Sequence, residues 1–219
     1  MRGAANFFER APAEAQSRLI LDPGATVLAG FAQPVDVALL DALAEIARVA
    51  PFRQMVTPGG WQMSVAMTNC GDVGWVTDRT GYRYDANDPL TNRPWPPMPA
   101  VIGDLAQRAA QAAGFAGFTP DACLINRYAP RSRLSLHQDK NERDVSMPIV
   151  SVSLGVKCMF LWGGQSRSDR VRRIELFHGD VVVWGGPARM TYHGINPLPV
   201  NHHVQTGAFR YNLTLRKAR

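Results

Sequence analysis

The sequence predicts a mostly β protein with flanking helices (α+β), built on a double-stranded β-helix, or jelly-roll, core. Short strand-like runs fill the second half of the chain, and Gly-Gly or Gly-Asp breaks separate several of them. Many short strands with such punctuation are typical of a double-sheet jelly roll. Two stretches with helical apolar spacing precede them, and 219 residues are enough for one compact domain with a substantial core.

Two helices are expected in the first half of the chain. Apolar residues recur with helical spacing over 34–50 and over 99–113, and Pro51 and Gly114 follow the two runs as stop signals. We expect both helices to pack against one outer face of the barrel.

The region between the helices is rich in turn formers. The strand-like runs 54–57 and 61–68 flank Pro58-Gly59-Gly60, which predicts a tight turn. The five prolines within 85–99 indicate a loop.

The second half reads as a succession of strands. They are expected at 122–128, 134–137, 149–154, 159–162, 173–177, 180–184, 190–193 and 209–215. The chain then divides into an N-terminal extension (1–24), a helical part (25–118) and the jelly-roll core (119–219), all within one compact domain.

The composition limits the class of protein. With 24 Lys and Arg against 18 Asp and Glu, the formal net charge is +6, which favours a nucleic-acid partner because neutralised phosphates release counterions. A solvated Arg-rich surface explains the charge equally well, although clusters at 131–133 and 167–173 favour a binding face. The three cysteines lie too far apart for a disulfide framework or a zinc site, so we expect reduced thiols in a cytoplasmic protein. No apolar run is long enough for a membrane span, and no secretory signal opens the chain.

An H-x-D triplet and a later histidine could form a metal site. His137 and Asp139 leave the same face of an extended segment, and His193 follows at the end of another strand-like run. Two imidazoles and one carboxylate suit a non-haem Fe(II) centre that keeps open coordination positions. A histidine before glycine is more often structural, and His178 is a competing ligand, although we interpret it as a turn residue. His202 and His203 (both in a polar loop) are expected in solvent.

The strand at the C-terminal end has one polar face. Period-two alternation places Arg210, Asn212, Thr214 and Arg216 together, with apolar residues on the other side. Facing a barrel interior, these side chains would be costly unless they hold a ligand, and paired arginines suit an anionic co-substrate. The alternative is an edge strand with its polar side in water.

At this point the chain resembles the AlkB-type Fe(II)/2-oxoglutarate-dependent DNA dealkylases. The resemblance covers about residues 25–216. It rests on Pro120–Tyr128 (PDACLINRY), Leu136–Asp139 (LHQD), Gly179–Trp184 (GDVVVW), Tyr192–Gly194 (YHG), Arg210–Arg216 (RYNLTLR), Pro51–Gly71 and Gly81-Tyr82.

The resemblance implies a complete catalytic apparatus. His137, Asp139 and His193 would bind Fe(II), and 2-oxoglutarate would be held by Asn126, Tyr128, Arg210, Asn212 and Arg216, with Arg210 and Tyr128 on its distal carboxylate. With O2 the enzyme would oxidise alkyl groups of bases such as 1-methyladenine and 3-methylcytosine, releasing formaldehyde, succinate and CO2. The expected partner is nucleic acid. Single-stranded DNA is favoured, double-stranded DNA and RNA remain open, and the expected state is a monomer.

The resemblance also implies a nucleotide-recognition lid within 25–118. Trp75 would stack on the flipped base opposite His137, Tyr82 and Tyr84 would contact the strand, and Arg167 would lie near the lesion. A core role is the alternative for Trp75, but its neighbours in the chain are mostly Gly, Asp and Thr. Asn141 stands where the best-known members have an aspartate that contacts the damaged base.

Two other functions remain open from the sequence. One is an Fe(II)/2-oxoglutarate hydroxylase that acts on a protein or a small molecule. The other is a catalytically inactive barrel that only binds nucleic acid.

Overall fold

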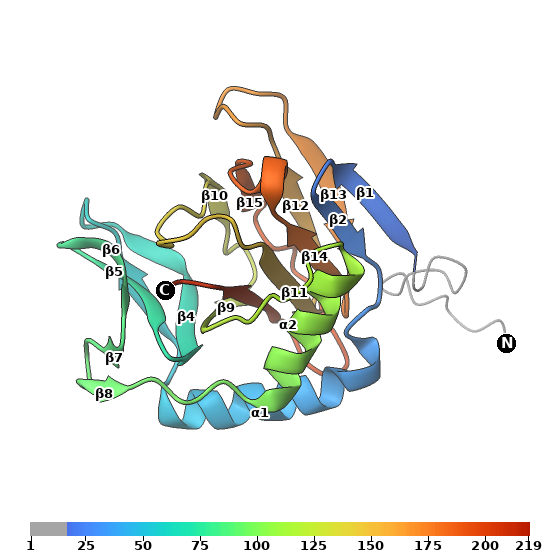
Figure 1. Cartoon of the computed structure of the whole chain (residues 1–219). Coiled ribbons are helices and arrows are strands. Elements are labelled where there is room, and N and C mark those ends of the chain that lie inside the picture. Colours follow the sequence, from blue (N-terminus) through green and yellow to red (C-terminus); the bar gives the residue numbers. More distant parts are fainter. Residues whose placement is uncertain (1–16) are drawn as a thin grey trace, which may run out of the picture.

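The structure, a computed structural model, describes residues 17–219, and within them no helix is long and apolar enough to span a membrane. Two antiparallel sheets form the body, and the prediction of a mostly β fold is confirmed (Figure 1). The larger sheet has the strand order β1 (Arg18–Asp22), β2 (Ala25–Leu28), β14 (Val181–Trp184), β11 (Ile149–Gly155), β16 (Arg210–Arg216), β9 (Ala122–Tyr128), β4 (Gln62–Gly71) and β3 (Arg53–Val56). The smaller sheet has the order β10 (Leu134–His137), β15 (His193–Ile195), β12 (Cys158–Trp162) and β13 (Arg172–Leu176).

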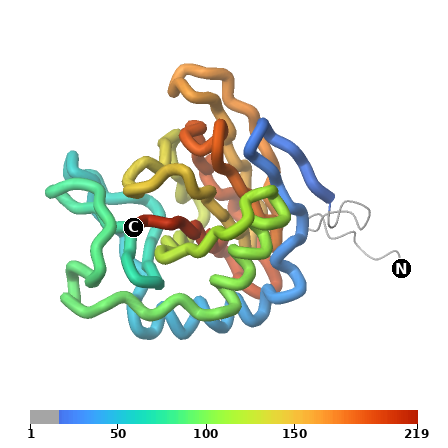
Figure 2. Tube along the Cα trace, viewed as in Figure 1, coloured from blue at the N-terminus to red at the C-terminus, as the bar shows by residue number. Residues whose placement is uncertain are grey.

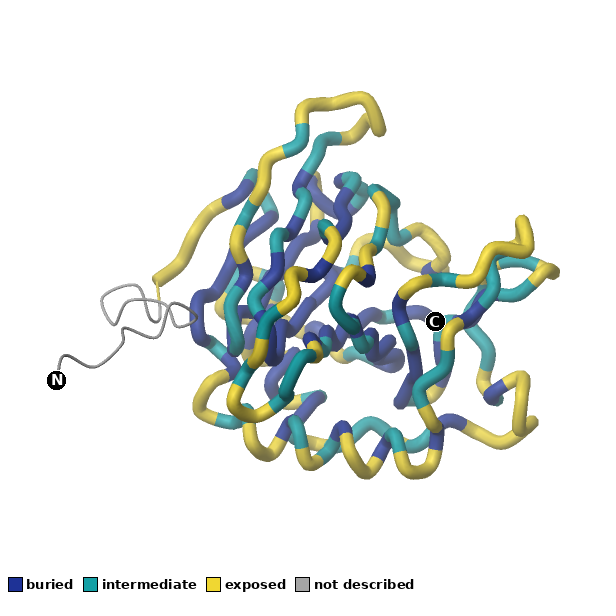
Figure 3. Tube along the Cα trace, turned by 180° about the vertical axis from the view of Figure 1, so that it is seen from behind, coloured by how far each residue is buried: buried dark blue, intermediate teal, exposed yellow. Residues whose placement is uncertain are grey.

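A core of large side chains lies between the two sheets. Trp184 and Tyr128 from the larger sheet join Phe160 and Trp162 from the smaller sheet in one buried cluster. Inward-facing residues alternate with outward-facing ones, as in a double-sheet sandwich. The interior strands are accordingly the most deeply buried part of residues 17–219 (Figure 3).

Both helices cover the outer face of the larger sheet, as predicted. They are α1 (Asp36–Val49) and α2 (Ala100–Ala112), joined to the sheet through a second buried cluster. Leu39 and Leu105 belong to this cluster together with Leu213 and Leu215, which lie on the apolar side of β16. The apolar face of β16 is therefore used by the helices, and its polar face is directed at the space between the sheets.

A small ribbon projects beyond β4. It consists of β5 (Gly74–Asp78) and β6 (Gly81–Asp85), paired only with each other, followed by the short ladder β7 (Asn87–Asp88) and β8 (Arg93–Pro94). The predicted turn at 58–60 joins β3 to β4, whereas the β5–β6 hairpin was not predicted as strands. The tract 85–99 is a loop that includes the short ladder.

Two boundaries differ from the sequence prediction. Residues 18–22, expected in the extension, form β1 and pair with β2 at the edge of the larger sheet, while residues 1–16 lie outside the described part. β2 in turn pairs with β14, so the earliest strands run beside a late segment of the chain (Figure 2). The strand expected at 190–193 begins only at His193, because Met190 belongs to a turn.

Candidate active site

A cavity of about 380 Å³ opens between the two sheets. The polar face of β16 forms one wall, since Arg210, Asn212, Thr214 and Arg216 all line it. β9 extends this wall in register, with Tyr128 paired to Arg210 and Asn126 paired to Asn212. The edge-strand alternative for β16 is therefore wrong, because β11 and β9 flank it on both sides.

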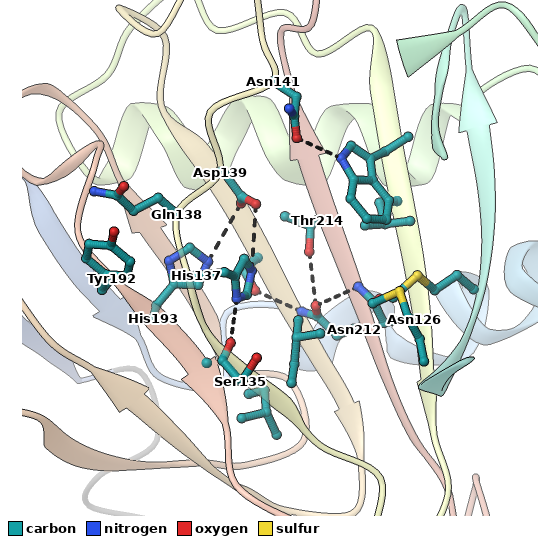
Figure 4. A pocket seen from close by; sticks show the side chains of 18 of the residues that line it. Asn126, Ser135, His137, Gln138, Asp139, Asn141, Tyr192, His193, Asn212 and Thr214 are labelled. Carbon is teal, nitrogen blue, oxygen red and sulfur yellow. Dashed lines mark hydrogen bonds and ion pairs between the residues drawn. The ribbon is translucent and has the colours of Figure 1, made fainter. Parts of the chain in front are cut away.

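Three potential ligands meet on this cavity. His137 of β10 and His193 of β15 are direct cross-strand partners in the smaller sheet, and Asp139 follows β10 by two residues. The ligand atoms of the three residues all lie within 4.8 Å of one another. Nε2 of His137 is 3.8 Å from one Asp139 carboxylate oxygen, and Nε2 of His193 is 3.7 Å from the other (Figure 4).

Hydrogen bonds fix both imidazoles for metal binding. Nδ1 of His137 lies 2.9 Å from the Ser135 carbonyl oxygen, and Nδ1 of His193 lies 3.0 Å from the Thr191 carbonyl oxygen. A carbonyl only accepts, so each Nδ1 carries the proton and each Nε2 keeps its lone pair for a metal.

Electrostatics keep the ligand set in the required protonation state. Burial and the neighbouring His137 lower the pKa of His193 to about 4, so its ring is neutral near pH 7. Burial alone would raise the pKa of Asp139, but Arg216 and the two imidazoles more than offset this and hold it well below its usual range. Arg216 donates from Nη2 and Nε to the same carboxylate oxygen, at 2.7 and 3.2 Å.

The β16 wall has unused donors that require an anion. Among residues 17–219, Arg210 Nε and Nη1 and Arg216 Nη1 are buried without a hydrogen-bond partner, as is the acceptor Asn126 Oδ1. Arg210 is 1% exposed and uses only Nη2, which donates to Ser153 Oγ. Buried unpaired guanidinium groups are costly, and a small dicarboxylate within the cavity would satisfy them. The wall thus fits 2-oxoglutarate, and the triad fits Fe(II).

The mouth of the cavity is aromatic and polar. Trp75 and Tyr82 line it from the β5–β6 hairpin, with ring centroids 5.7 Å apart in a stacked arrangement. Trp75 Nε1 donates to Asn141 Oδ1 at 3.1 Å, which joins the hairpin to the loop after the triad (Figure 4). Arg167, from the exposed loop between β12 and β13, also lines the cavity.

The remaining predicted substrate residue, Tyr84, lies outside the cavity lining. Its hydroxyl donates to Glu142 Oε1 at 2.5 Å, and Glu142 also pairs with Arg189 at 2.9 Å and Arg216 at 3.3 Å. Glu142 stands in a polar stretch of the sequence, yet its side chain is only 2% exposed. Arg189 further donates to the Asp139 carbonyl oxygen, so this buried network holds the backbone of the metal-ligand loop.

The other histidines are remote from the triad, as expected. His178 lies 2.9 Å from Asp36 at Nε2 and accepts from the Gly155 backbone at Nδ1. Its ring stacks on that of His203 at 4.4 Å, so His203 is half-buried rather than fully solvated. His178 is thus no metal ligand in this arrangement.

Sequence reasoning missed several lining residues. These include Gln138, Phe160, Trp184 and Tyr192. Tyr192 and Gln138 are sequence neighbours of triad residues, and this proximity could have identified them as residues of the site. For Trp184 and Phe160 the only sequence signal is strand alternation, which shows which residues of a strand point into the interior.

Comparisons with known proteins agree with this geometry. Residues 24–216 match the family model described as the 2OG-Fe(II) oxygenase superfamily. The alpha-ketoglutarate-dependent dioxygenase AlkB of Salmonella typhimurium is 60% identical over 198 residues, covering 90% of this chain and 92% of that protein. The human nucleic acid dioxygenase ALKBH1 is 31% identical over 121 residues, covering 55% of this chain and 31% of that protein. A solved structure of OsALKBH1 superposes with a TM-score of 0.81 at 25% identity, covering 92% of this chain and all of that chain.

Proposed function

The chain belongs to the 2OG-Fe(II) oxygenase superfamily and to its AlkB branch, and from this premise we propose that it repairs single alkylated bases flipped out of single-stranded DNA. It is an Fe(II)- and 2-oxoglutarate-dependent dioxygenase that dealkylates nucleic-acid bases oxidatively. The proposal adds the form of the nucleic acid and the residues that receive the base.

In this proposal the triad binds the iron and the β16 wall binds the co-substrate. When bound, Fe(II) with 2-oxoglutarate and O2 supplies the oxidising power that hydroxylates the alkyl carbon, after which formaldehyde leaves the base. We assign His137, Asp139 and His193 as the iron ligands. Three protein ligands leave coordination positions for the keto acid and for oxygen.

The co-substrate would be held by residues whose polar atoms are otherwise unused. Arg210 and Tyr128 receive its distal carboxylate in this assignment, and Asn126, Asn212 and Arg216 complete the wall. Arg210 Cζ lies 4.9 Å from the Tyr128 ring centroid, so the two side chains occupy one end of the wall together. The fork of the guanidinium matches a carboxylate better than a single ammonium does.

The observation that carries the substrate proposal is the composition of the cavity mouth. A half-exposed Trp75 ring, stacked on Tyr82, borders the cavity that contains the iron ligands, and Asn141 and Arg167 border it too. An indole stacks on any base, while polar neighbours can contact the base edge and its phosphate. We assign Trp75, Tyr82, Asn141 and Arg167 to the flipped nucleotide, and Tyr84 to the support of the lid.

Single-stranded DNA is favoured because an unpaired base enters such a cavity without loss of a base pair. We propose that the enzyme acts as a monomer. The three thiols, Cys70, Cys123 and Cys158, are buried and free, which supports action in the reducing cytoplasm.

Succinate release tests this function. The purified enzyme with Fe(II) and 2-oxoglutarate is offered oligonucleotides with 1-methyladenine, 3-methylcytosine or etheno-adenine, each single- and double-stranded. We expect succinate and formaldehyde in equal amounts with methylated single strands, and slower release with duplexes. Equal rates on duplex and single strand would contradict the strand preference, and no stimulation by any methylated oligonucleotide would contradict the function.

A further inference from the structure

A buried carboxylate just before β9 is occupied by residues 217–219, which we call the tail segment. Asp121 is 6% exposed, and its Oδ1 accepts a hydrogen bond from the Ala218 backbone N–H at 2.6 Å. Its Oδ2 accepts from the Arg219 backbone N–H at 3.2 Å and from Lys217 Nζ at 2.9 Å. A buried carboxylate is costly unless it is paired and hydrogen-bonded. The tail segment supplies all three of these bonds.

The tail segment directly continues the β16 wall. It follows Arg216, whose guanidinium donates to the assigned iron ligand Asp139. The Asp121 backbone N–H donates to the Arg216 carbonyl oxygen at 3.0 Å. Asp121 therefore holds the chain on both sides of the point at which β16 ends, once with its backbone and once with its carboxylate.

The tail segment also contacts the lid, the β5–β6 hairpin, and the loop after the triad. Ala218 is 3% exposed and belongs to a small apolar cluster with Val73 and Ala122, against which Tyr84 of β6 packs. The Ala218 carbonyl oxygen accepts from the Arg143 backbone N–H at 3.2 Å. Figure 1 shows this end of the chain beside β5 and β6. One buried residue of the tail segment thus supports two parts of the cavity mouth.

The backbone of Asp121 holds the base of the lid as well. The Asp72 N–H donates to the Asp121 carbonyl oxygen at 2.8 Å. At Gly71 an added β-carbon would lie 2.5 Å from the same oxygen, so the two backbones are in close contact. The hairpin pairs only with itself, and an isolated two-stranded ribbon is marginally stable. The lid therefore needs such supports from the body.

We propose that Asp121 is a positioning residue for nucleic-acid binding, which acts through the tail segment to hold the lid at the cavity mouth. Its carboxylate fixes Ala218, and Ala218 supports the ring of Tyr84 and the backbone of Arg143. This inference rests on the proposed function, because it takes the lid as the site of the flipped nucleotide. Loss of the carboxylate loosens the lid and leaves the triad and the β16 wall in place.

Hydrogen exchange measures the support without any turnover. In the enzyme with Fe(II) and 2-oxoglutarate but no O2, Asp121→Ala should increase amide exchange over residues 74–85 and 140–143, because their support is released. Deletion of residues 217–219 should produce the same increase. Asp121→Ala in the shortened chain should add nothing, since two changes that act through one contact are not additive.

Asp180→Ala is the matched control for loss of a buried carboxylate. Asp180 is 1% exposed and accepts from the backbone N–H groups of Gly30 and Phe177, which belong to neither the lid nor the triad loop. It should lower the stability of the fold and leave exchange over residues 74–85 relative to the core strands unchanged.

Kinetics distinguish positioning of the lid from a general loss of structure. Asp121→Ala should raise the KM for a single-stranded 1-methyladenine oligonucleotide about tenfold, as expected when hydrogen bonds to a charged group are lost. The KM for 2-oxoglutarate and kcat should stay near those of the native enzyme. Asp121→Asn should lie between the two, because its amide oxygen can still accept from Ala218 while its amide nitrogen faces the donors of Lys217 and Arg219.

Additive effects of Asp121→Ala and the deletion would overturn the inference, as would unchanged exchange in the lid or a rise in the KM for 2-oxoglutarate alone. Far-ultraviolet circular dichroism checks that each variant is folded, and Asp121→Asn replaces Asp121→Ala where the latter is not. The outcome is separable from the repair activity. Coupled changes in lid exchange without turnover of any methylated strand by the native enzyme would contradict only the proposed function. Turnover with unchanged exchange in Asp121→Ala would contradict only the role of Asp121.

Discussion

The β16 wall and the β5–β6 lid border the same cavity but are built in different ways. β16 is hydrogen-bonded along its length to β11 and β9, and its Arg210 is 1% exposed. The lid is a two-stranded ribbon on its own, and its Tyr82 is 48% exposed. An isolated two-stranded ribbon is marginally stable, so the lid depends on a few anchors to the body.

These anchors are identifiable. Asn69 of β4 bonds both the carbonyl and the N–H of Trp75, at 3.1 and 3.0 Å, and the Tyr84 hydroxyl reaches the buried Glu142. If the assignments proposed above hold, the wall presents its polar side chains from a strand paired on both sides, whereas the lid is held to the body at isolated points. Changes in the wall should affect every substrate strongly, and changes in the lid should affect nucleic-acid binding more weakly.

The most severe effect should come from the metal site on which both regions converge. His193→Ala should abolish turnover of all methylated substrates, because one of three ligands is lost. Metal titration should show the loss of high-affinity binding, while circular dichroism shows an intact fold. His178→Ala should retain turnover. Turnover in His193→Ala together with loss of turnover in His178→Ala would show that His178, and not His193, is the iron ligand.

The wall itself is tested at Arg210. Arg210→Ala should weaken the binding of 2-oxoglutarate by about 2–5 kcal/mol, because the buried carboxylate of the co-substrate loses its charged partner. Arg210→Lys should recover only part of this, since an ammonium cannot reproduce the guanidinium fork. The KM for 2-oxoglutarate is measured for both variants. An unchanged KM in Arg210→Ala would contradict the assignment of the wall to the co-substrate.

The lid is tested at Trp75. Trp75→Ala should weaken binding of a methylated single strand by about 1–3 kcal/mol through lost stacking. The KM for 2-oxoglutarate should stay near that of the native enzyme, because the wall is untouched. Tyr211→Phe, on the helix-facing side of β16, is a control for general loss of packing. A rise in both KM values in Trp75→Ala would show that the two regions do not act separately.

The smallest effect is expected at Asn141, where lid and triad loop meet. 1-Methyladenine is cationic near neutral pH, and a neutral acceptor is worth about 1 kcal/mol less to it than a carboxylate. Asn141→Asp should raise kcat/KM for 1-methyladenine several-fold, with little gain for the mostly neutral etheno-adenine. Glu142 cannot supply this charge, since Arg189, Arg216 and Tyr84 already bind it. Equal gains on both lesions would show that the position does not sense charge.

The wall could be predicted from the sequence because its signal is local. Period-two alternation over 210–216 separates a polar face from an apolar face, and a polar face inside a barrel demands a ligand. Both faces are confirmed, one on the cavity and one on the helices. The order of His137, Asp139 and His193 was likewise enough to identify the metal ligands by resemblance.

The features that the sequence did not predict all depend on distant partners. Glu142 lies in a polar stretch of the sequence. Its burial depends on the ion pairs with Arg189 and Arg216 and on the hydrogen bond from Tyr84, which offset the loss of hydration. Strand β1 has no local signal that distinguishes it from an extension. It pairs with β2, and β2 joins the sheet only through β14, which is far away in the sequence. The direct pairing of His137 with His193 is set by sheet register, which no short motif encodes.

The strand order of the larger sheet has a consequence for synthesis of the chain. β1 and β2 form one edge and β3 and β4 the other, whereas the centre, β14, β11, β16 and β9, comes entirely from residues 122–216. The ribosome therefore releases both margins before any central strand, and the final strand must insert between two neighbours. At roughly 5–20 residues per second, the first hairpin waits on the order of ten seconds or more for β14. During that time each early hairpin keeps an unpaired edge, and such an edge can pair with another chain and start aggregation.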